Sequence, residues 1–373
     1  MIPFVQLTPG EDAAAVDAAI ARVVRRGWFV LGPELDAFER QFAEACGAGR
    51  AVGVGTGTDA LAIALRVLGI GPGDEVITSP LSAAFSALAI MMTGARPVFA
   101  DIDPDRLTLD PRAVAAAITS RTAAILPVHL YGQPADMTAI AAVAARHDLA
   151  IVEDCCQAHL ATCEGRPVGS FGELSAYSFY PTKNLGALGD GGAITTSDAS
   201  LADRARRLRN GGQTDRYHHA EFGVNSRLDE LQAAVLSVRL ELLPRWTARR
   251  RDLARHYRKA LAGVDTIAVP PERDAGHVYH LFPVRSGARE AVQAHLKASG
   301  VETLIHYPVP IPAQPALAKE APADCPVARL VCDEVFSLPL YPALPDGAVA
   351  QVAGALATGP APTATRHERD TQR

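Results

Sequence analysis

A lysine and an acidic residue near the middle of the chain have the surroundings that covalent cofactor chemistry requires. Lys183 lies in the loop 178–186, which is rich in small, polar and turn-forming residues. Asp154 ends the apolar run 150–154, 29 positions before that lysine. A lysine amine can form an imine with an aldehyde, and a carboxylate can keep a pyridine nitrogen protonated. The pair therefore predicts a pyridoxal phosphate enzyme in which both residues are catalytic.

Two polar side chains close to this pair fit the same cofactor. Gln157 follows Asp154 by three positions and could hydrogen-bond the phenolic oxygen of the ring. Ser178 could contact the phosphate, and the glycines after Lys183 allow the backbone to approach closely. Taken singly, Asp154 could instead cap the next loop, and Lys183 could be an ordinary surface lysine.

A glycine-rich turn at 53–60 offers a site for the phosphate. It follows a predicted strand and opens a helix, where free backbone N–H groups and threonine hydroxyls can hold an anion. The same turn fits the dinucleotide-binding fingerprint Gly55-x-Gly57-x-x-Ala60, with Asp74 or Glu75 as the ribose-binding acid. Those acids precede a strand, whereas a ribose-binding acid should follow one, which disfavours a nicotinamide-dependent oxidoreductase.

Strand-like apolar runs alternate with helical patterns through the N-terminal half of the chain. The predicted strands are 51–54, 75–78, 97–101, 123–129, 149–154, 175–179 and 192–196. The predicted helices are 11–25, 33–45, 58–68, 83–92, 111–119 and 136–147. This alternation predicts an α/β fold with a largely parallel sheet covered by helices on both faces.

The character of the sequence changes after Gly212. A long amphipathic helix is expected at 228–243, and Pro244 begins another that ends near Leu261. We place a large cofactor-binding domain at 1–240, a smaller C-terminal α+β domain at 241–357, with a short strand at 279–284, and a disordered tail at 358–373. The arginine clusters at 204–209 and 245–258 are interpreted as solvated helix faces.

Composition limits the functions that the chain can have. Its 373 residues are 48% hydrophobic and 21% charged, with a formal net charge of -5, which disfavours nucleic-acid binding. The N-terminus lacks the pattern of a signal peptide, and no apolar run reaches the ~20 residues of a membrane span, so we expect a cytoplasmic protein. Six cysteines without C-x-x-C spacing predict neither a metal site nor disulfides. Cys155 and Cys156 are expected to be small packing residues beside the cofactor.

Several of these segments, taken in order, resemble the DegT/DnrJ/EryC1/StrS family of pyridoxal phosphate-dependent nucleotide-sugar aminotransferases. The resemblance extends over nearly the whole chain. It rests on the segments 28–34, 55–61, 74–77, 153–159, 178–186, 225–227, 306–308 and 337–342.

The resemblance implies a type I aminotransferase fold and a homodimer with shared active sites. The fold has a large domain, with a mixed, mostly parallel seven-stranded sheet covered by helices, and a smaller C-terminal α+β domain. Lys183 would form the imine, Asp154 would meet the pyridine nitrogen, and Gln157 would lie near the ring hydroxyl. The remaining implied contacts are Gly57, Thr58 and Ser178 to the phosphate, Asn225 to the phosphate in the neighbouring subunit, Arg227 to the donor carboxylate there, and Tyr180, His306 and Tyr307 to the substrate.

Two positions depart from the family pattern. Most relatives stack an aromatic ring on the cofactor from a position that is Ala83 here, so we expect either that Phe85 substitutes for it or that the stacking is absent. Relatives also often have a histidine a few residues after the His306-Tyr307-Pro308 motif. The segment 309–315 has none, so sugar contacts there are expected to differ.

The resemblance also implies a two-stage amino transfer. L-Glutamate would give its amino group to the cofactor, and a nucleotide-linked ketosugar would receive it, giving an amino sugar for a glycan or a secondary metabolite. Lys183 would carry the proton in both stages. The segments 209–218 and 225–230 favour a dTDP-3-keto-6-deoxyhexose, with amination at C4 as second choice. The alternatives are a sugar dehydratase, whose members carry histidine at the lysine position, and a non-catalytic regulator of the same fold.

Overall fold

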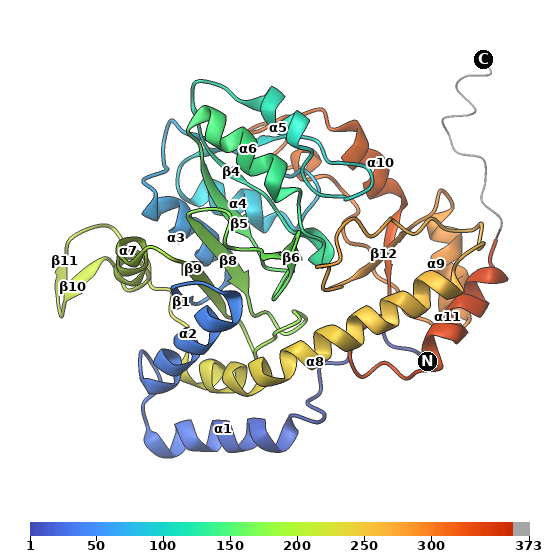
Figure 1. Ribbon diagram of the computed structural model, residues 1–373, viewed down its shortest axis with the longest axis horizontal. Helices are drawn as coiled ribbons and strands as arrows, with labels where there is room; N and C mark the ends of the chain where they lie inside the picture. Colours follow the sequence, from blue (N-terminus) through green and yellow to red (C-terminus); the bar gives the residue numbers. More distant parts are fainter. Residues whose placement is uncertain (361–373) are drawn as a thin grey trace.

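A seven-stranded sheet lies at the centre of the computed structural model, which describes residues 1–360 (Figure 1). Its strands, in spatial order, are β1 (Arg50–Val54), β9 (Gly192–Thr196), β8 (Leu174–Ser178), β5 (Ala150–Asp154), β4 (Thr122–Leu126), β2 (Glu75–Thr78) and β3 (Arg96–Phe99). Strand β9 pairs antiparallel with both neighbours, and the other pairs are parallel. This mixed, mostly parallel sheet confirms the predicted α/β fold, and each predicted strand is present with small shifts at its ends.

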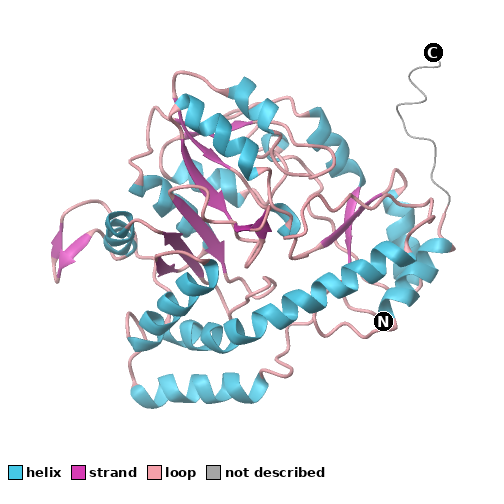
Figure 2. Cartoon of the chain, in the orientation of Figure 1, coloured by secondary structure: helices cyan, strands magenta, loops and turns pink. Residues whose placement is uncertain are grey.

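Helices cover both faces of the sheet because alternate strand residues send their side chains to opposite sides (Figure 2). Val76 and Val152 belong to one apolar cluster, and the adjacent Ile77 and Ile151 belong to another. The first cluster includes α3 (Gly57–Val67), α4 (Phe85–Met92), α7 (Ala199–Arg209) and α10 (Pro326–Glu334). The second includes α2 (Pro33–Cys46), α5 (Pro111–Ala117), α6 (Met137–His147) and the first half of α8 (Glu230–Ala260).

A third apolar cluster forms the core of the C-terminal region. It joins the second half of α8 with α9 (Arg289–Ala298), α11 (Ala348–Ala357) and the antiparallel pair β12 (Phe282–Arg285) and β13 (Val335–Leu338). The strand expected at 279–284 begins later, because Tyr279 has a left-handed φ of 47°. The domain limits 1–240 and 241–357 stay a prediction. Residues 361–373 of the predicted disordered tail lie outside the described part of the chain.

Helix α8 runs through Pro244, where the sequence predicts the end of one helix and the start of another. That prediction was wrong. A proline inside a helix costs about 3 kcal/mol, because the ring removes a backbone hydrogen bond. Packing holds both halves of α8 in line, since Leu236 is buried beside the sheet and Tyr257 is buried in the C-terminal cluster. Tertiary contacts therefore outweigh the local preference.

The clusters of arginines that were predicted to be solvated contain two buried members, so this interpretation was partly wrong. Arg209 pairs with Glu39. Arg250 donates to the carbonyl oxygen of Leu340 at 2.9 Å, and burial lowers its pKa to about 10. The sequence reveals the charge of an arginine but not the distant acceptors that the fold brings to it.

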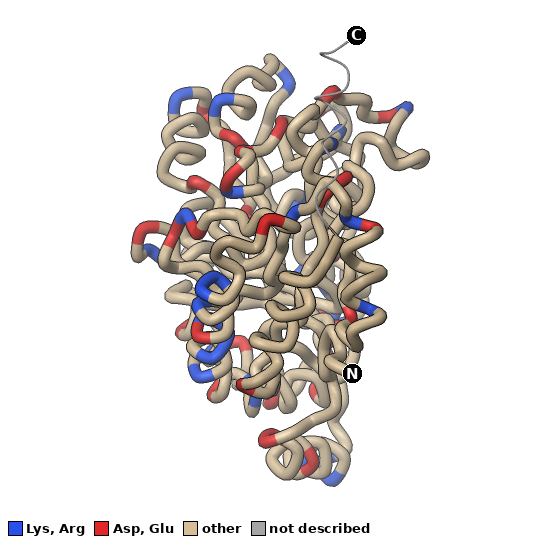
Figure 3. Tube along the Cα trace, turned by 90° about the vertical axis from the view of Figure 1, so that its right-hand side faces the viewer, with Lys and Arg blue, Asp and Glu red and all other residues tan. Residues whose placement is uncertain are grey.

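The remaining elements lie around this core. Helix α1 (Ala13–Arg26) packs against α8, and the hairpin of β10 (Gln213–Asp215) and β11 (His218–His219) projects from the body at the left of Figure 1. A second small hairpin joins β6 (Thr162–Cys163) and β7 (Arg166–Pro167). Basic and acidic positions are interspersed along the trace (Figure 3). No helix within residues 1–360 has the length and apolar character of a membrane span.

Candidate active site

The carboxyl ends of the parallel strands bring the predicted site residues to one edge of the sheet. Strand β5 ends at Asp154, and β8 ends at Ser178, where the loop with Lys183 begins. Strand β1 leads through Gly55 and Thr56 into α3, which begins at Gly57. Open α/β sheets bind ligands at this edge, so the topology explains why residues far apart in sequence meet there.

The loop that carries Lys183 is held from two sides. The side-chain amide of Asn184 donates to the carbonyl oxygen of Val278 at 3.1 Å, which ties the loop to the C-terminal region. The guanidinium of Arg239, on α8, donates to the carbonyl oxygen of Gly186 at 2.6 Å. These bonds hold the backbone that directly follows Lys183, and the N–H of Lys183 donates to the carbonyl oxygen of Tyr180 at 2.8 Å, so the fold restricts the direction of the side chain.

The amine of Lys183 lies in an environment that favours its neutral form. Burial lowers its pKa from the ordinary value, while the nearby Cys156 and Asp154 act in the opposite direction. These effects place Asp154 and Cys156 within electrostatic reach of the amine. A lysine with a lowered pKa is a better nucleophile near neutral pH than a solvated one.

Asp154 is only 5% exposed, yet its carboxylate has two hydrogen-bond donors. The backbone N–H of Cys156 donates to Oδ1 at 3.1 Å, and the hydroxyl of Ser86 donates to Oδ2 at 2.8 Å. Two donors of this kind fix the orientation of the carboxylate. Ser86 lies in the first turn of α4 and was not predicted as a site residue.

Gln157 is held in one amide orientation by a backbone donor. The N–H of Tyr131 donates to its Oε1 at 2.7 Å, and its Nε2 donates to the hydroxyl of Tyr307 at 3.2 Å. The hydroxyl of Tyr131 donates to the carbonyl oxygen of His306. Two of the predicted substrate-binding residues, His306 and Tyr307, are therefore tied to the segment that carries Gln157.

The predicted phosphate site is a tight cradle at the start of α3. A Cβ atom on Gly57 would lie 2.7 Å from Cβ of Ser178 and 2.9 Å from Sγ of Cys156, so only glycine fits there. Thr56 caps the helix by accepting from the N–H of Asp59 at 3.0 Å. Gly57, Ser178 and Cys156 thus lie together, with Thr58 on the first turn.

Three histidines, His159, His280 and His306, lie within electrostatic reach of Lys183. Burial first, and the lysine charge second, lower the pKa of His159 to about 3 and that of His306 to about 4. The same two causes hold the pKa of His280 well below its usual range. All three rings are therefore neutral near pH 7. His280, whose Nδ1 lies 3.2 Å from Oδ1 of Asn184, was not predicted from the sequence.

Four predicted residues lie on exposed or half-exposed surface. Phe85 is 61% exposed and Tyr180 is 52% exposed. Asn225 is exposed and forms a backbone bridge with Asn210, whose side-chain oxygen accepts from Arg227 at 3.1 Å. The roles of these four residues toward cofactor and substrate stay predictions.

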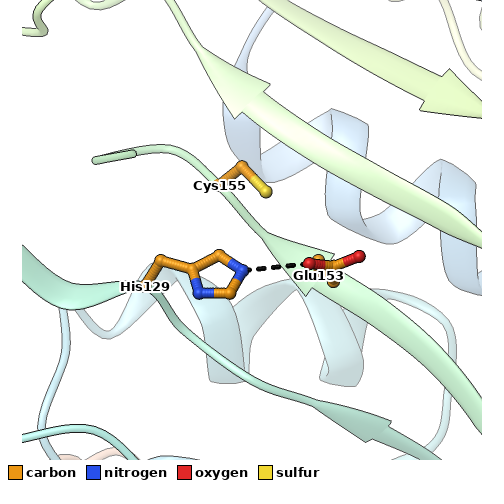
Figure 4. A group of neighbouring side chains, drawn as sticks. All are labelled: His129, Glu153 and Cys155. Atoms are coloured by element: carbon orange, nitrogen blue, oxygen red, sulfur yellow. Dashed lines mark hydrogen bonds and ion pairs between the residues drawn. The ribbon is translucent and has the colours of Figure 1, made fainter. Parts of the chain in front are cut away.

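A second group of titratable side chains, His129, Glu153 and Cys155, lies close to the site (Figure 4). Within residues 1–360 it is the one group whose ligand atoms are near enough to hold a metal ion. Each ring nitrogen of His129 already has a partner: Nδ1 accepts from the N–H of Ala135 at 3.1 Å, and Nε2 lies 3.1 Å from Glu153. Hydrogen bonds therefore engage the histidine and the carboxylate.

The dinucleotide interpretation of the glycine turn is wrong. Asp74 and Glu75 lie at the amino end of β2, which is the edge opposite the glycine turn. The carboxylate of Glu75 is engaged by Arg121 at 2.6 Å and by the hydroxyl of Thr119 at 2.6 Å. An acid so placed cannot reach a ribose bound at the turn.

The donor set fits pyridoxal phosphate. Asp154 offers an anion for the pyridinium nitrogen, Gln157 an amide for the ring oxygen, and Lys183 an amine for the aldehyde. Gly57, Thr58 and Ser178 offer a helix N-terminus and hydroxyl groups for the phosphate.

Comparisons with known proteins identify a family and several relatives of the chain. The model of the DegT/DnrJ/EryC1/StrS aminotransferase family matches residues 11–357. The dTDP-3-amino-3,4,6-trideoxy-alpha-D-glucose transaminase of Streptomyces venezuelae is 50% identical over 348 residues, covering 92% of each chain. The erythromycin biosynthesis sensory transduction protein EryC1 of Saccharopolyspora erythraea is 47% identical, covering 96% of this chain and 99% of its own.

Solved structures with a similar fold are also known. The crystal structure of S. venezuelae DesV in complex with a ketimine intermediate superposes with a TM-score of 0.92 at 49% identity, covering 95% of this chain and 97% of that one. The structure of ntda from Bacillus subtilis with bound cofactor PMP has a TM-score of 0.89 at 30% identity, covering 95% and 84%.

Proposed function

Since the chain belongs to the DegT/DnrJ/EryC1/StrS aminotransferase family, we propose that it transfers the amino group of L-glutamate to a keto carbon of a nucleotide-linked sugar, with pyridoxal phosphate as cofactor. The observation that carries the proposal is the meeting of Lys183, Asp154 and the Gly57 cradle at one edge of the sheet. A lysine and a carboxylate within electrostatic reach, beside the free backbone N–H groups at the start of a helix, suit this cofactor.

The residues of the chain divide the work of binding. Lys183 would hold the cofactor covalently through its amine, and Asp154 would hold a proton on the ring nitrogen. When bound, the protonated ring draws electrons from the carbon that loses its proton, which is the chemistry the cofactor supplies. Gln157 would orient the ring through its amide, whose direction Tyr131 already fixes. Gly57, Thr58 and Ser178 would anchor the phosphate end.

Lys183 would also move the proton in both half-reactions. The amine has its pKa lowered by burial, so near neutral pH it can accept a proton and return it. The neighbouring histidines are neutral, with the pKa of His306 lowered to about 4 and that of His159 to about 3. With such low pKa values these histidines are poor proton acceptors near neutral pH, so Lys183 is left as the proton carrier.

The acceptor that we favour is a dTDP-linked 3-keto-6-deoxyhexose. The name of the 50% identical S. venezuelae relative places its amino group at position 3 of a dTDP-linked sugar. A 4-keto sugar is the second choice. Incubating the protein with L-glutamate and a panel of dTDP-, UDP- and GDP-linked 3-keto and 4-keto sugars, with the product identified by NMR, tests this choice.

We also propose that two copies of the chain share their active sites. Asn225 is exposed on its own chain, and Phe222, three positions earlier, is 92% exposed. An exposed aromatic ring beside a polar residue with an expected role at the phosphate suits a surface that meets a second copy. Arg227 would serve the same neighbouring site. Sedimentation or light scattering should then give a dimer mass.

The replacement Lys183→Ala tests the core of the proposal. We expect it to lower turnover by at least about a thousandfold, because tether and proton carrier are lost together. Lys297→Ala, on the exposed face of α9, is the matched control and should leave turnover unchanged. Borohydride reduction of wild-type protein with pyridoxal phosphate should attach the cofactor to the peptide that contains Lys183, as mass spectrometry can establish. Turnover that survives in Lys183→Ala would refute the role.

A non-catalytic regulator is the second candidate, because the 47% identical EryC1 is named a sensory transduction protein. A regulator has no need of a lysine of lowered pKa beside a buried carboxylate. A protein that binds the cofactor but fails to release it as the amine form when glutamate is added would favour the regulator. A sugar dehydratase is disfavoured, since Lys183 stands where those relatives have histidine.

A further inference from the structure

The carboxylate of Asp154 is held by two donors of different origin. The N–H of Cys156 belongs to the same turn as Asp154 and moves with it. The hydroxyl of Ser86 comes from α4, on another part of the fold, and donates at 2.8 Å across 68 positions of sequence. Ser86 is 2% exposed, so water does not compete for this bond. Of the two donors, only Ser86 ties the carboxylate to a separate element.

The direction of the Ser86 bond follows from the groups around it. An ionised carboxylate only accepts, so the Ser86 hydroxyl donates to Asp154 and keeps its lone pairs free to accept. The hydroxyl of Ser82, which is also buried, lies 3.4 Å from that of Ser86. The loop before α4 is itself fixed, since the N–H of Ile311 donates to the carbonyl oxygen of Pro80 at 2.8 Å.

We propose that Ser86 is a positioning residue, which orients the Asp154 carboxylate toward the ring nitrogen of the cofactor and stabilises its charge. The inference rests on the proposed function, because Asp154 has a partner to meet only if the pyridine ring binds there. With Oδ1 bonded to Cys156 and one lone pair of Oδ2 bonded to Ser86, the remaining lone pairs are available to a ligand. Free rotation of the carboxylate would weaken that contact, and Ser86 prevents it.

The replacement Ser86→Ala tests the role, with Ser86→Thr as the conservative variant and Ser82→Ala as the matched control. Ser86→Ala should bind pyridoxal phosphate about tenfold more weakly, since it loses one hydrogen bond to a charged group. Ser86→Thr should restore binding, because it keeps a hydroxyl on the same carbon. Ser82→Ala removes a buried hydroxyl that does not contact Asp154 and should bind within about twofold of wild type.

A spectroscopic readout separates positioning from a merely structural role. The absorbance of the bound cofactor, followed against pH, reports the protons on the ring and at the lysine linkage. Ser86→Ala should shift the midpoint of that titration, whereas Ser82→Ala and Ser86→Thr should not. The titratable groups that face Asp154 and must be considered in the fit are Lys183, Cys155, Cys156 and Tyr307.

Three results would overturn the inference. One is a Ser86→Ala protein with the wild-type affinity and titration. Another is a Ser86→Ala apoprotein that melts well below wild type and loses affinity only as far as Ser82→Ala does, since the hydroxyl would then serve packing. The third is a wild-type protein that neither binds pyridoxal phosphate nor gives a lysine adduct. In that case the proposed function fails first, and the role of Ser86 falls with it.

Discussion

Glu153 and Asp154 are neighbours on β5, yet their carboxylates meet very different surroundings. Glu153 is fully buried, and its oxygens lie 2.7 Å from the N–H of Gly169, 2.7 Å from that of Phe171 and 3.0 Å from that of Gly172. A fourth contact comes from His129. Among residues 1–360, two groups donate to Asp154, which lies at the strand end. The first carboxylate is saturated by its own chain, and the second keeps capacity for a ligand.

The difference teaches how the two kinds of acid can be told apart. Successive strand residues point to opposite faces, so adjacent acids never share one environment. Glu153 holds the loop 169–172 against the strand, so its carboxylate is already used by contacts within the protein. A buried carboxylate with unused lone pairs is costly unless a partner binds, so the free lone pairs of Asp154 support the role proposed for it in binding a ligand.

The largest effects are expected when each carboxylate is replaced singly, because one replacement should lower activity and the other should lower stability. Asp154→Asn removes a charge and keeps the shape, and we expect kcat to fall by about a hundredfold or more. Its melting temperature should stay within about 2 °C of wild type. Glu153→Gln turns an NH2 group toward backbone donors, and we expect it to lose about 3–5 kcal/mol of unfolding free energy. Steady-state kinetics and urea denaturation measure the two effects.

The opposite pattern would reverse the assignment. If Glu153→Gln were as stable as wild type but inactive, the saturated acid would be the functional one. Asp154→Ser is a useful second variant, because it removes the carboxylate without adding an amide that could bond to Ser86.

The buried histidines should make the stability of the protein depend on pH. The pKa of His159 is lowered to about 3 and that of His306 to about 4, both below the unfolded value near 6.5. Between those values the unfolded chain binds more protons, so stability is complete above pH 6.5 and is lost as pH falls toward 4. We expect a loss of about 2 kcal/mol for His306 between pH 7 and 4.5. Urea unfolding at each pH measures this loss, and the unfolding free energy of His306→Gln should change less with pH. An equal pH dependence in the two proteins would show that His306 is not the cause.

Local sequence was enough to propose residues for the site but not to find the residues that support them. Asp154 ends β5 and Lys183 lies in the loop that follows β8, each within a few residues of polar or glycine-rich neighbours, and the structure brings the two within electrostatic reach. Ser86 was missed because its partner is 68 positions away. The break at Pro244 was predicted and is absent, because packing of both halves of α8 cannot be read from local propensity.

A smaller effect concerns the thiol of Cys156, two positions after Asp154. Cys156 is only partly buried, while the other five cysteines are buried. Burial raises the pKa of Cys156 well above its usual range, so its labelling should be slow and speed up with rising pH. A maleimide should modify the apoprotein mainly at Cys156. Labelling should be about tenfold slower when the cofactor occupies nine-tenths of the sites, because only the free protein then reacts. Peptide mapping against Cys156→Ser identifies the position, and labelling that cofactor leaves unaffected would place the thiol outside the site.

The smallest expected effect is that of metal. His129, Glu153 and Cys155 are close enough to bind an ion, but Nδ1 of His129 accepts from Ala135, so Nε2 carries the proton and donates to Glu153. The pKa of the Cys155 thiol is raised well above its usual range by burial, which disfavours the thiolate that zinc requires. A metal would have to displace the hydrogen bond that His129 gives Glu153. We therefore expect a chelator to change the melting temperature by less than about 1 °C, and elemental analysis to find less than one zinc per chain. The opposite result would be one zinc per chain in the wild type, with both the zinc and part of the stability lost in His129→Gln. The group of His129, Glu153 and Cys155 would then be a metal site, and Glu153 would no longer differ from Asp154 in being fully engaged by the protein alone.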